Sequence, residues 1–139
     1  VLQDRFKGKL WATARYLHNW PDTPENKAFN ERFKKRWVRL PNYSAETTYS
    51  AFFIMKAAVE KARSLETAKV IDAMKGMQIR NPGGVRTFRA EDQQFIYNVP
   101  AGRPVIDAKY PIPILGDLKV FAAKDYYRHP PFTPVAVTK

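Results

Sequence analysis

The sequence has 139 residues, enough for one domain and too few for two of ordinary size. Its 45% hydrophobic and 27% charged residues are typical of a globular protein and exclude wholesale disorder. It contains no cysteine, which excludes disulfide bonds, thiol catalysis and thiolate metal ligands. No apolar run approaches the roughly 20 residues of a membrane-spanning helix, and the opening VLQDRFKGKL lacks the apolar core of a secretory signal.

The net charge of +11, from 24 basic and 13 acidic residues, has two interpretations. Basic residues gathered on one face with aromatic residues between them would indicate a nucleic-acid partner. Basic residues spread along the chain would form a solvated surface, or half of a protein whose other half is more acidic. Here they are spread, the only cluster is RFKKRW, and no nucleic-acid-binding motif is present. The second interpretation is favoured.

The first predicted element is a strand. In KGKLWATARYL, a tight turn at Gly8 leads into a short apolar run from Leu10 to Ala14, which predicts a buried strand. RYLHNWPD is then the loop that leaves the carboxyl end of this strand.

A helix with a clear start follows this loop. Thr23 is the expected N-cap, Pro24 the first helical residue and Glu25 an acidic residue of the first turn. Three aromatic residues at steps of four share one face: Phe29, Phe33 and Trp37. The helix is therefore amphipathic, packs on an apolar surface, and is broken by Pro41.

A second helix is predicted in SAETTYSAFFIMKAAVEKARS, with Ser44 as its cap. Its apolar side chains occupy more than half of the circumference: Tyr49, Phe52, Phe53, Met55, Ala58, Val59 and Ala62. Such a helix needs neighbours on two sides, because a surface helix buries only one stripe.

The third predicted helix lies in SLETAKVIDAMKG and turns its apolar residues inward: Val70, Ile71 and Met74. Gly76 stands where a C-terminal cap belongs, and Leu65 is expected to join the same core.

After NPGG the hydrophobic period changes from helical to two, which predicts a hairpin or meander from Val85 to Val105. From Asp107 onward prolines dominate, so YPIPILGDL and YRHPPFTPV are expected to be extended segments on a surface rather than central strands or helices. The predicted class is α/β, with one strand, three helices, a hairpin and a proline-rich extended tail. Three apolar helix faces outnumber the strands that receive them, so we expect the fold to be incomplete without sequence on the amino-terminal side.

The sequence offers little catalytic chemistry. His18 and His129 are far apart in predicted loops, and no set of residues has the spacing of a metal site. Glu91 and Asp92 are adjacent in a turn and point apart, which turn chemistry explains. Glu46 has two interpretations: an acidic residue favoured by the helix dipole, or part of a binding cleft. We expect no enzyme activity, metal or cofactor.

Five segments in this order resemble one receptor family: KGKLWATARYL, DTPENKAFNERFKKRW, NYSAETTYSAFFIMKAAVEKA, TAKVIDAMKG and GGVRTFRAEDQQ with YNVPAGRPV. The chain is similar to the carboxyl-terminal part of the substrate-binding proteins of ABC transporters for branched-chain amino acids, amides and related acids, which have the type I periplasmic binding fold. The resemblance covers nearly the whole chain, least definitely from Tyr110 onward.

The resemblance implies two α/β lobes with the solute between them. Residues 1–22 would then be the end of a second-lobe strand and a crossover loop. Residues 23–82 would be helices of the first lobe. Residues 83–139 would be the return hairpin to the second lobe and the proline-rich tail.

The resemblance also implies a function: binding of an amino acid, amide or other small carboxylate without catalysis, followed by delivery to a membrane permease from the periplasm. It places four residues of this chain toward the cleft: Tyr16, Ser44, Glu46 and Tyr49. An aromatic residue such as Tyr49 on a wide apolar helix face is also typical of a core.

Two other functions remain open. A cytoplasmic ligand-sensing regulator could use the same fold, and a basic nucleic-acid-binding domain would explain the charge and bind with strong salt dependence. For the chain by itself, we expect exposed apolar faces, covered by a separate polypeptide holding the rest of the receptor or by self-association.

Overall fold

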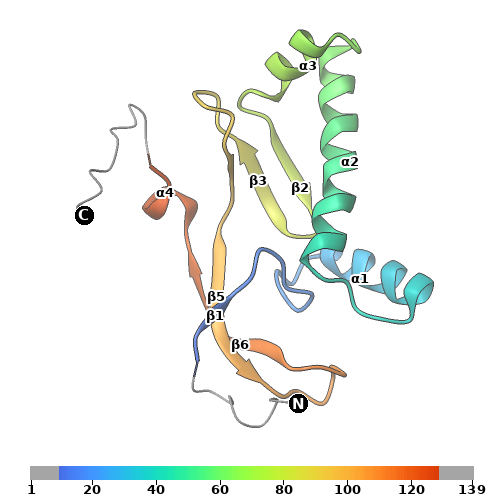
Figure 1. Cartoon of the computed structure of the whole chain (residues 1–139), viewed down its shortest axis with the longest axis vertical. Coiled ribbons are helices and arrows are strands. Elements are labelled where there is room, and N and C mark those ends of the chain that lie inside the picture. The colour runs from blue at the N-terminus through green and yellow to red at the C-terminus, as the bar shows by residue number, and fades with distance from the viewer. Residues whose placement is uncertain (1–9, 129–139) are drawn as a thin grey trace, which may run out of the picture.

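The structure, a computed structural model, describes residues 10–128. Gly8 and His129, which carried sequence-based expectations, lie outside the described residues. The described chain is mixed α/β, with four helices and two separate three-stranded antiparallel sheets (Figure 1).

The first helix, α1 (Pro24–Trp37), begins as its sequence predicts. The side chain of Thr23 accepts a hydrogen bond from the backbone of Asn26 (3.3 Å), and Pro24 occupies the first turn. Phe29 is buried, whereas Trp37 is 57% exposed. The predicted aromatic face therefore exists, but only its first residue is buried.

The second helix, α2 (Tyr43–Ala62), is capped by Asn42, and the expectation for Ser44 was wrong. Asn42 Oδ1 accepts a hydrogen bond from the backbone of Ala45 at 3.0 Å, so the helix begins before Ser44. The helix buries one stripe at steps of four: Glu46, Ser50, Ile54 and Ala58. Its opposite side stays open among the described residues, where Phe52 is 73% exposed.

The third helix, α3 (Thr67–Met74), buries Val70 and is followed by Gly76 at φ +68°, a conformation in which glycine avoids side-chain strain. Leu65 is 85% exposed, so its predicted place in the core was wrong. It lies in the short turn between α2 and α3, outside the periodic stretch of either helix.

The first sheet has the order β2–β3–β4, with β2 (Gln78–Asn81), β3 (Gly84–Phe88) and β4 (Phe95–Ile96) all antiparallel. Of the hairpin or meander predicted from Val85 to Val105, β3 and β4 pair in this sheet, whereas β5 lies in the other sheet. Strand β2 was not predicted. The core lies between this sheet and the helices α2, which runs alongside it, and α3, which lies at one end of α2 (Figure 1). Its buried members are Ile54, Ala58, Val70 and Met77.

The second sheet has the order β1–β5–β6 and lies away from α2 and α3 (Figure 1). Its strands are β1 (Ala12–Thr13), β5 (Val99–Val105) and β6 (Ile114–Phe121). Strand β1 is shorter than predicted and both of its residues are exposed rather than buried.

In the proline-rich region, the extended segment predicted in YPIPILGDL leads into the regular edge strand Ile114–Phe121, and the short helix α4 (Ala123–Tyr126), which was not predicted, lies between the two proline-rich segments. Strand β6 contains no proline, because the prolines of YPIP precede it. Both prolines of β5 have a β6 residue opposite, Pro100 with Val120 and Pro104 with Leu115, and neither has a β1 residue opposite, because β1 pairs only with Ala101 and Gly102.

Candidate functional site

Tyr16, the first predicted site residue, lies in the loop after β1 and is buried against α1. Its hydroxyl donates to Asn26 Oδ1 at 2.7 Å, and Asn30 Oδ1 lies 3.0 Å away. Burial, and then the negative charge of Glu46, raise the pKa of the Tyr16 phenol, while the contact with Asn30 opposes them.

The loop that carries Tyr16 is fastened to α1 by two asparagine side chains. Asn26 Nδ2 donates to the carbonyls of Pro21 (3.0 Å) and His18 (3.3 Å), and Asn30 Nδ2 donates to the same His18 carbonyl at 2.7 Å. These bonds tie the crossover between β1 and α1 to the helix, because both asparagine side chains of α1 donate to carbonyls of the loop.

Glu46 lies in the first turn of α2 and is fully buried. Ser50 Oγ donates to Glu46 Oε1 at 2.6 Å, and Arg86 Nη2 from β3 donates to Glu46 Oε2 at 3.0 Å. The Arg86 guanidinium also lies over two aromatic rings, 5.6 Å from that of Phe95 and 5.3 Å from that of Tyr97. The carboxylate of Glu46 therefore has two partners inside this chain.

Tyr49 is half-buried between α1 and α2. Its ring centroid is 4.7 Å from that of Phe29 and 4.7 Å from that of Phe53, and its hydroxyl accepts a hydrogen bond from Arg32 Nη2 at 3.0 Å. Ser44 is exposed in the first turn of α2 and shares with Tyr49 the wall of an open groove of about 610 Å³, whose floor includes Phe29 and Phe33.

The structure brings three of the four predicted residues together. Phe29 contacts the ring of Tyr16 edge-on at 6.0 Å and that of Tyr49 at 4.7 Å, and the charge of Glu46 acts on Tyr16. Ser44 meets this cluster only through the groove that it shares with Tyr49. No finding tests whether these side chains contact a solute, so that role stays a prediction.

A second cavity, of about 390 Å³, lies between α1, α2 and the end of β2. Aromatic and charged side chains both line it: Tyr49 and Phe53 from α2, Glu25 and Arg32 from α1, and Arg80 from β2. Its size is in the range of small-molecule sites, and its mixed walls suit a molecule with one apolar and one charged part. Tyr49 lines both this cavity and the groove.

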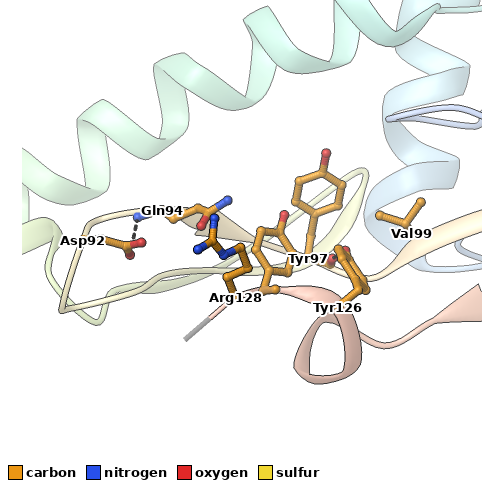
Figure 2. A pocket seen from close by; sticks show the side chains of 7 residues that line it. Asp92, Gln94, Tyr97, Val99, Tyr126 and Arg128 are labelled. Atoms are coloured by element: carbon orange, nitrogen blue, oxygen red, sulfur yellow. Dashed lines mark hydrogen bonds between the residues drawn. The ribbon is translucent and has the colours of Figure 1, made fainter. Parts of the chain in front are cut away.

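Another pocket, of about 570 Å³, is lined by none of the four predicted residues and is formed at α4 (Figure 2). The hydroxyls of Tyr126 and Tyr127, which line it, donate to the backbone carbonyls of Tyr97 and Phe95. Asp92 at its edge is paired with Arg89 through both carboxylate oxygens, and this hydrogen bonding lowers the pKa of Asp92 to about 2. The polar groups of this pocket are thus largely engaged within the protein.

The roles of three residues were not predicted from the sequence: Asn26, Ser50 and Arg86. One signal was present: Asn26 and Asn30 lie one turn apart inside a helix, where asparagine is disfavoured unless its side chain has another partner. Arg86 gave no signal, because an arginine in an alternating strand looks like an exposed residue.

Within residues 10–128, no cluster of three or more histidine, aspartate or glutamate side chains could hold a metal ion. Over the same residues, no helix is both long enough and apolar enough to span a bilayer.

Comparison with known proteins identifies the family of this chain. The model of the periplasmic binding protein family matches residues 2–108. Among solved structures, an ABC-type branched-chain amino acid transporter from Rhodopseudomonas palustris is 26% identical with a TM-score of 0.75, over 84% of this chain and 31% of that chain. An ABC transporter protein from the same species is 34% identical with a TM-score of 0.54, over 58% of this chain and 24% of that one.

A leucine binding protein from Thermotoga maritima, 20% identical, shares the fold with a TM-score of 0.66 over 84% of this chain and 31% of that one. No curated protein matches the chain. The chain spans about 31% of the length of the first of these solved structures. Because the family model covers most of its residues, the chain belongs to the periplasmic binding protein family.

Proposed function

We propose that the protein carrying this chain is the extracytoplasmic solute-binding component of an ABC importer, which encloses its solute between two lobes and catalyses no reaction. The family supports a binding role, because its matched members are named as ABC transporter and substrate-binding proteins. Delivery to a membrane permease and a periplasmic location follow from the same proposal.

The observation that carries the proposal is the division of the described chain into two groups of elements. The helices α2 and α3 pack with the β2–β3–β4 sheet, and α1 contacts α2 through Phe29 and Tyr49. Strands β1, β5 and β6 form the other sheet. Two segments, residues 14–23 and 97–98, connect the two groups. Paired connections of this kind can act as a hinge, because a few residues at element ends absorb the rotation of two rigid bodies.

The division between the two groups suggests a different boundary between the lobes from the predicted one. A boundary between residues 82 and 83 would fall inside the turn of the β2–β3 hairpin, whereas the two sheets separate near Asn98. We propose that the strands up to β4 move with the helices and that β5 and β6 belong to the other lobe.

The proposed solute is a small carboxylate with an apolar body, such as a branched-chain amino acid, a related amide or an aromatic acid. Two solved structures from R. palustris hold 3,4-dihydroxybenzoic acid and 4-hydroxybenzoate, and others are named for amino acids. The 390 Å³ cavity supports this class, since Arg32 and Arg80 could pair with a carboxylate beside the rings of Tyr49 and Phe53.

The four predicted residues would have different roles. Tyr49 lines the 390 Å³ cavity, so we propose that it contacts the solute there. Ser44 lines only the groove of about 610 Å³, so we propose that it contacts a part of the solute that extends past Tyr49 into this groove. Tyr16 and Glu46 are buried and bonded to other side chains, so we propose that they position the crossover loop and β3.

Isothermal titration of the whole polypeptide with leucine, an aliphatic amide and 4-hydroxybenzoate tests this function. We expect one of them to bind, and Tyr49→Ala to weaken the affinity at least about tenfold, which is about 1.4 kcal/mol. Tyr43→Ala is the matched control, because Tyr43 begins the same helix but is 53% exposed and lines neither cavity.

Absence of binding by all three solute classes, or conversion of a bound solute to a product detected by mass spectrometry, would contradict the proposal. Fractionation of the source cells separates the receptor from a cytoplasmic regulator on the same fold.

A further inference from the structure

His18, in the crossover between β1 and α1, belongs to a turn that is fastened to α1. His18 and Asn19 form the centre of this tight turn, residues 17–20, which one backbone hydrogen bond of 3.1 Å closes. The His18 carbonyl accepts hydrogen bonds from two side chains of α1, that of Asn30 at 2.7 Å and that of Asn26 at 3.3 Å. The position of the turn is therefore set by the helix.

The same turn also contacts the second sheet. Asn19 Nδ2 donates a hydrogen bond to the carbonyl of Leu115 on β6 at 2.9 Å. The imidazole of His18 meets the ring of Tyr110, in the connection between β5 and β6, edge-on, with the ring centroids 5.1 Å apart. We call these two contacts the latch, because they join a turn that is fastened to α1 to the strands of the other group.

The latched turn buries two neighbouring polar atoms that have no hydrogen-bond partner among residues 10–128: His18 Nε2 and Asn19 Oδ1. The described residues already exclude both atoms from solvent, so a segment outside residues 10–128 could reach them only if the turn moved. A buried polar group without a partner costs free energy, which contact with water relieves. The latched turn therefore holds a cost that opening the latch would remove.

Protonation of His18 would add to this cost. The imidazolium carries a hydrogen on both ring nitrogens, and the one on Nε2 would have no acceptor in the latched turn. Burial lowers the pKa of the His18 imidazole. The other ionisable groups in the adjoining pocket of about 220 Å³ are Asp22, Lys27, Glu31 and Tyr110. Lys27 pairs with Asp22 at 2.6 Å and Glu31 is exposed, so neither acid offsets the burial.

We propose that His18 makes the latch sensitive to pH: the latch is closed while the imidazole is neutral and opens when it is protonated. The imidazolium is better solvated in water than in the turn, so protonation favours movement of the turn away from Tyr110 and Leu115. That the two groups are lobes which rotate about this crossover rests on the proposed function, whereas the latch rests on the contacts of the turn. Acid would then loosen one of the two hinge connections.

The direction of the effect follows from linkage between protonation and the latch. Opening the latch exposes the imidazole and returns its pKa to the ordinary value of 6.5, whereas the latched turn holds it lower. The contribution of neutral His18 to the latch is therefore complete above pH 6.5 and is lost as the pH falls below it.

The test uses the whole polypeptide labelled with ¹⁵N. The side-chain amide signal of Asn19, assigned by its loss in Asn19→Ala, reports the hydrogen bond to Leu115. This signal should shift as the pH is lowered from about 7.5 to about 5, the range in which histidine titrates. The midpoint of the shift should lie below pH 6.5 and coincide with that of the His18 imidazole signals.

Two histidine variants control this test. His18→Phe keeps an aromatic ring beside Tyr110 but cannot be protonated, so its Asn19 signal should not shift over this range. His129→Phe is the matched control, because it removes the other histidine of the 139 residues and should keep the shift. Solute affinity should change at least about fivefold over the same range in the unaltered protein but not in His18→Phe.

Three results would overturn the latch: an Asn19 signal that does not shift with pH, a shift that persists in His18→Phe, or a His18 imidazole that titrates above pH 6.5. A shift of the Asn19 signal with unchanged solute affinity would overturn the coupling of the latch to lobe rotation. A protein that binds no solute at either pH would refute the proposed function, and the Asn19 signal would still decide the latch.

Discussion

At the scale of single residues, Glu46 and Arg86 form the most deeply buried ion pair of the described chain, with exposed side-chain fractions of 0% and 6%. The pair joins the first turn of α2 to β3, which are 40 residues apart in sequence. Desolvation of both charges makes the pair costly, so it contributes specificity of packing more than stability. Removal of one partner would nevertheless leave the other buried without its counter-ion.

Arg86→Met should lower the free energy of unfolding by about 3–5 kcal/mol, because the Glu46 carboxylate would be left buried without its cation. The double variant Glu46→Met/Arg86→Met should recover most of this loss. Urea unfolding measures both values, and Arg80→Met is the control, since Arg80 is exposed on β2 and should change stability by no more than about 0.5 kcal/mol. A double variant as unstable as the single one would show that the pair is not the cause.

Gly83 has a specific reason to be glycine. A Cβ atom built at Gly83 would lie 1.9 Å from Nη2 of Arg86, the atom that bonds Glu46. Gly83→Ala should therefore displace the Arg86 guanidinium and destabilise the fold, and the loss should be smaller in the Glu46→Met/Arg86→Met background. Equal losses in the two backgrounds, measured by urea unfolding, would contradict this reason.

The raised pKa of Tyr16 predicts that the free energy of unfolding depends on pH. Its pKa is raised above the ordinary value of 10.0, so the folded protein holds the phenol proton more tightly than the unfolded chain. This contribution to stability is complete below about pH 10 and is lost as the pH rises through the folded pKa. The free energy of unfolding should thus fall more steeply above pH 10 in the unaltered protein than in Tyr16→Phe.

The control for this pH dependence is Tyr43→Phe, because Tyr43 is 53% exposed. It should retain the slope of the unaltered protein. Tyr16→Phe should also cost about 1–2 kcal/mol at neutral pH, since Asn26 Oδ1 loses its 2.7 Å donor. Identical slopes in all three proteins above pH 10 would refute the role of Tyr16.

At the scale of elements, helix starts were the most predictable feature. Thr23 followed by Pro24 specifies the start of α1 locally, and the structure confirms it. The start of α2 was predicted two residues late, because Asn42 and Ser44 are both good caps and only the backbone geometry selects one. Strand β6 was not predicted, because the prolines before it disfavour a regular strand. The strand itself begins after them and contains no proline.

Thr23→Ala should destabilise the protein by about 1 kcal/mol, because the Asn26 backbone N–H loses its side-chain acceptor. Thr23→Ser should restore most of the loss. Thr48→Ala is the matched control. It should not destabilise the protein, because Thr48 is exposed in α2 and alanine is the better helix former. Thermal unfolding followed by circular dichroism distinguishes the variants, and an unchanged midpoint for Thr23→Ala would rule out the cap.

At the scale of the whole molecule, large apolar side chains of the two long helices remain uncovered among the described residues: Trp37 (57%), Phe52 (73%), Phe53 (53%) and Met55 (51%). Exposed patches of this kind mark surfaces that bind another protein segment. The width of the apolar face of α2 predicts cover on two sides, and within residues 10–128 only one side is covered.

The 139-residue chain by itself should therefore self-associate at micromolar concentration. Phe52→Ser/Phe53→Ser should reduce the average mass measured by size-exclusion chromatography with light scattering. Thr47→Ser/Thr48→Ser, at exposed positions of the same helix, should not. A monomeric unaltered chain would contradict the expectation.

The sequence by itself determined features that depend on neighbouring residues: the cap at Thr23, the aromatic face that begins at Phe29, the three helices and the β3–β4 turn. It also carried the resemblance that the family match confirms. These are encoded within a few residues, because capping, periodicity and turn chemistry act over one or two helical turns.

Only the tertiary structure decided that Glu46 pairs with Arg86, that Tyr16 bonds Asn26, and that the cationic groups of Arg103 and Lys119 each lie 5.1 Å from the Trp11 ring centroid. These contacts join different elements, and no local pattern records which face of a strand or helix another element will cover. Long-range pairing is set by how the elements pack together to bury apolar surface and satisfy buried charges, so it belongs to the folded chain as a whole.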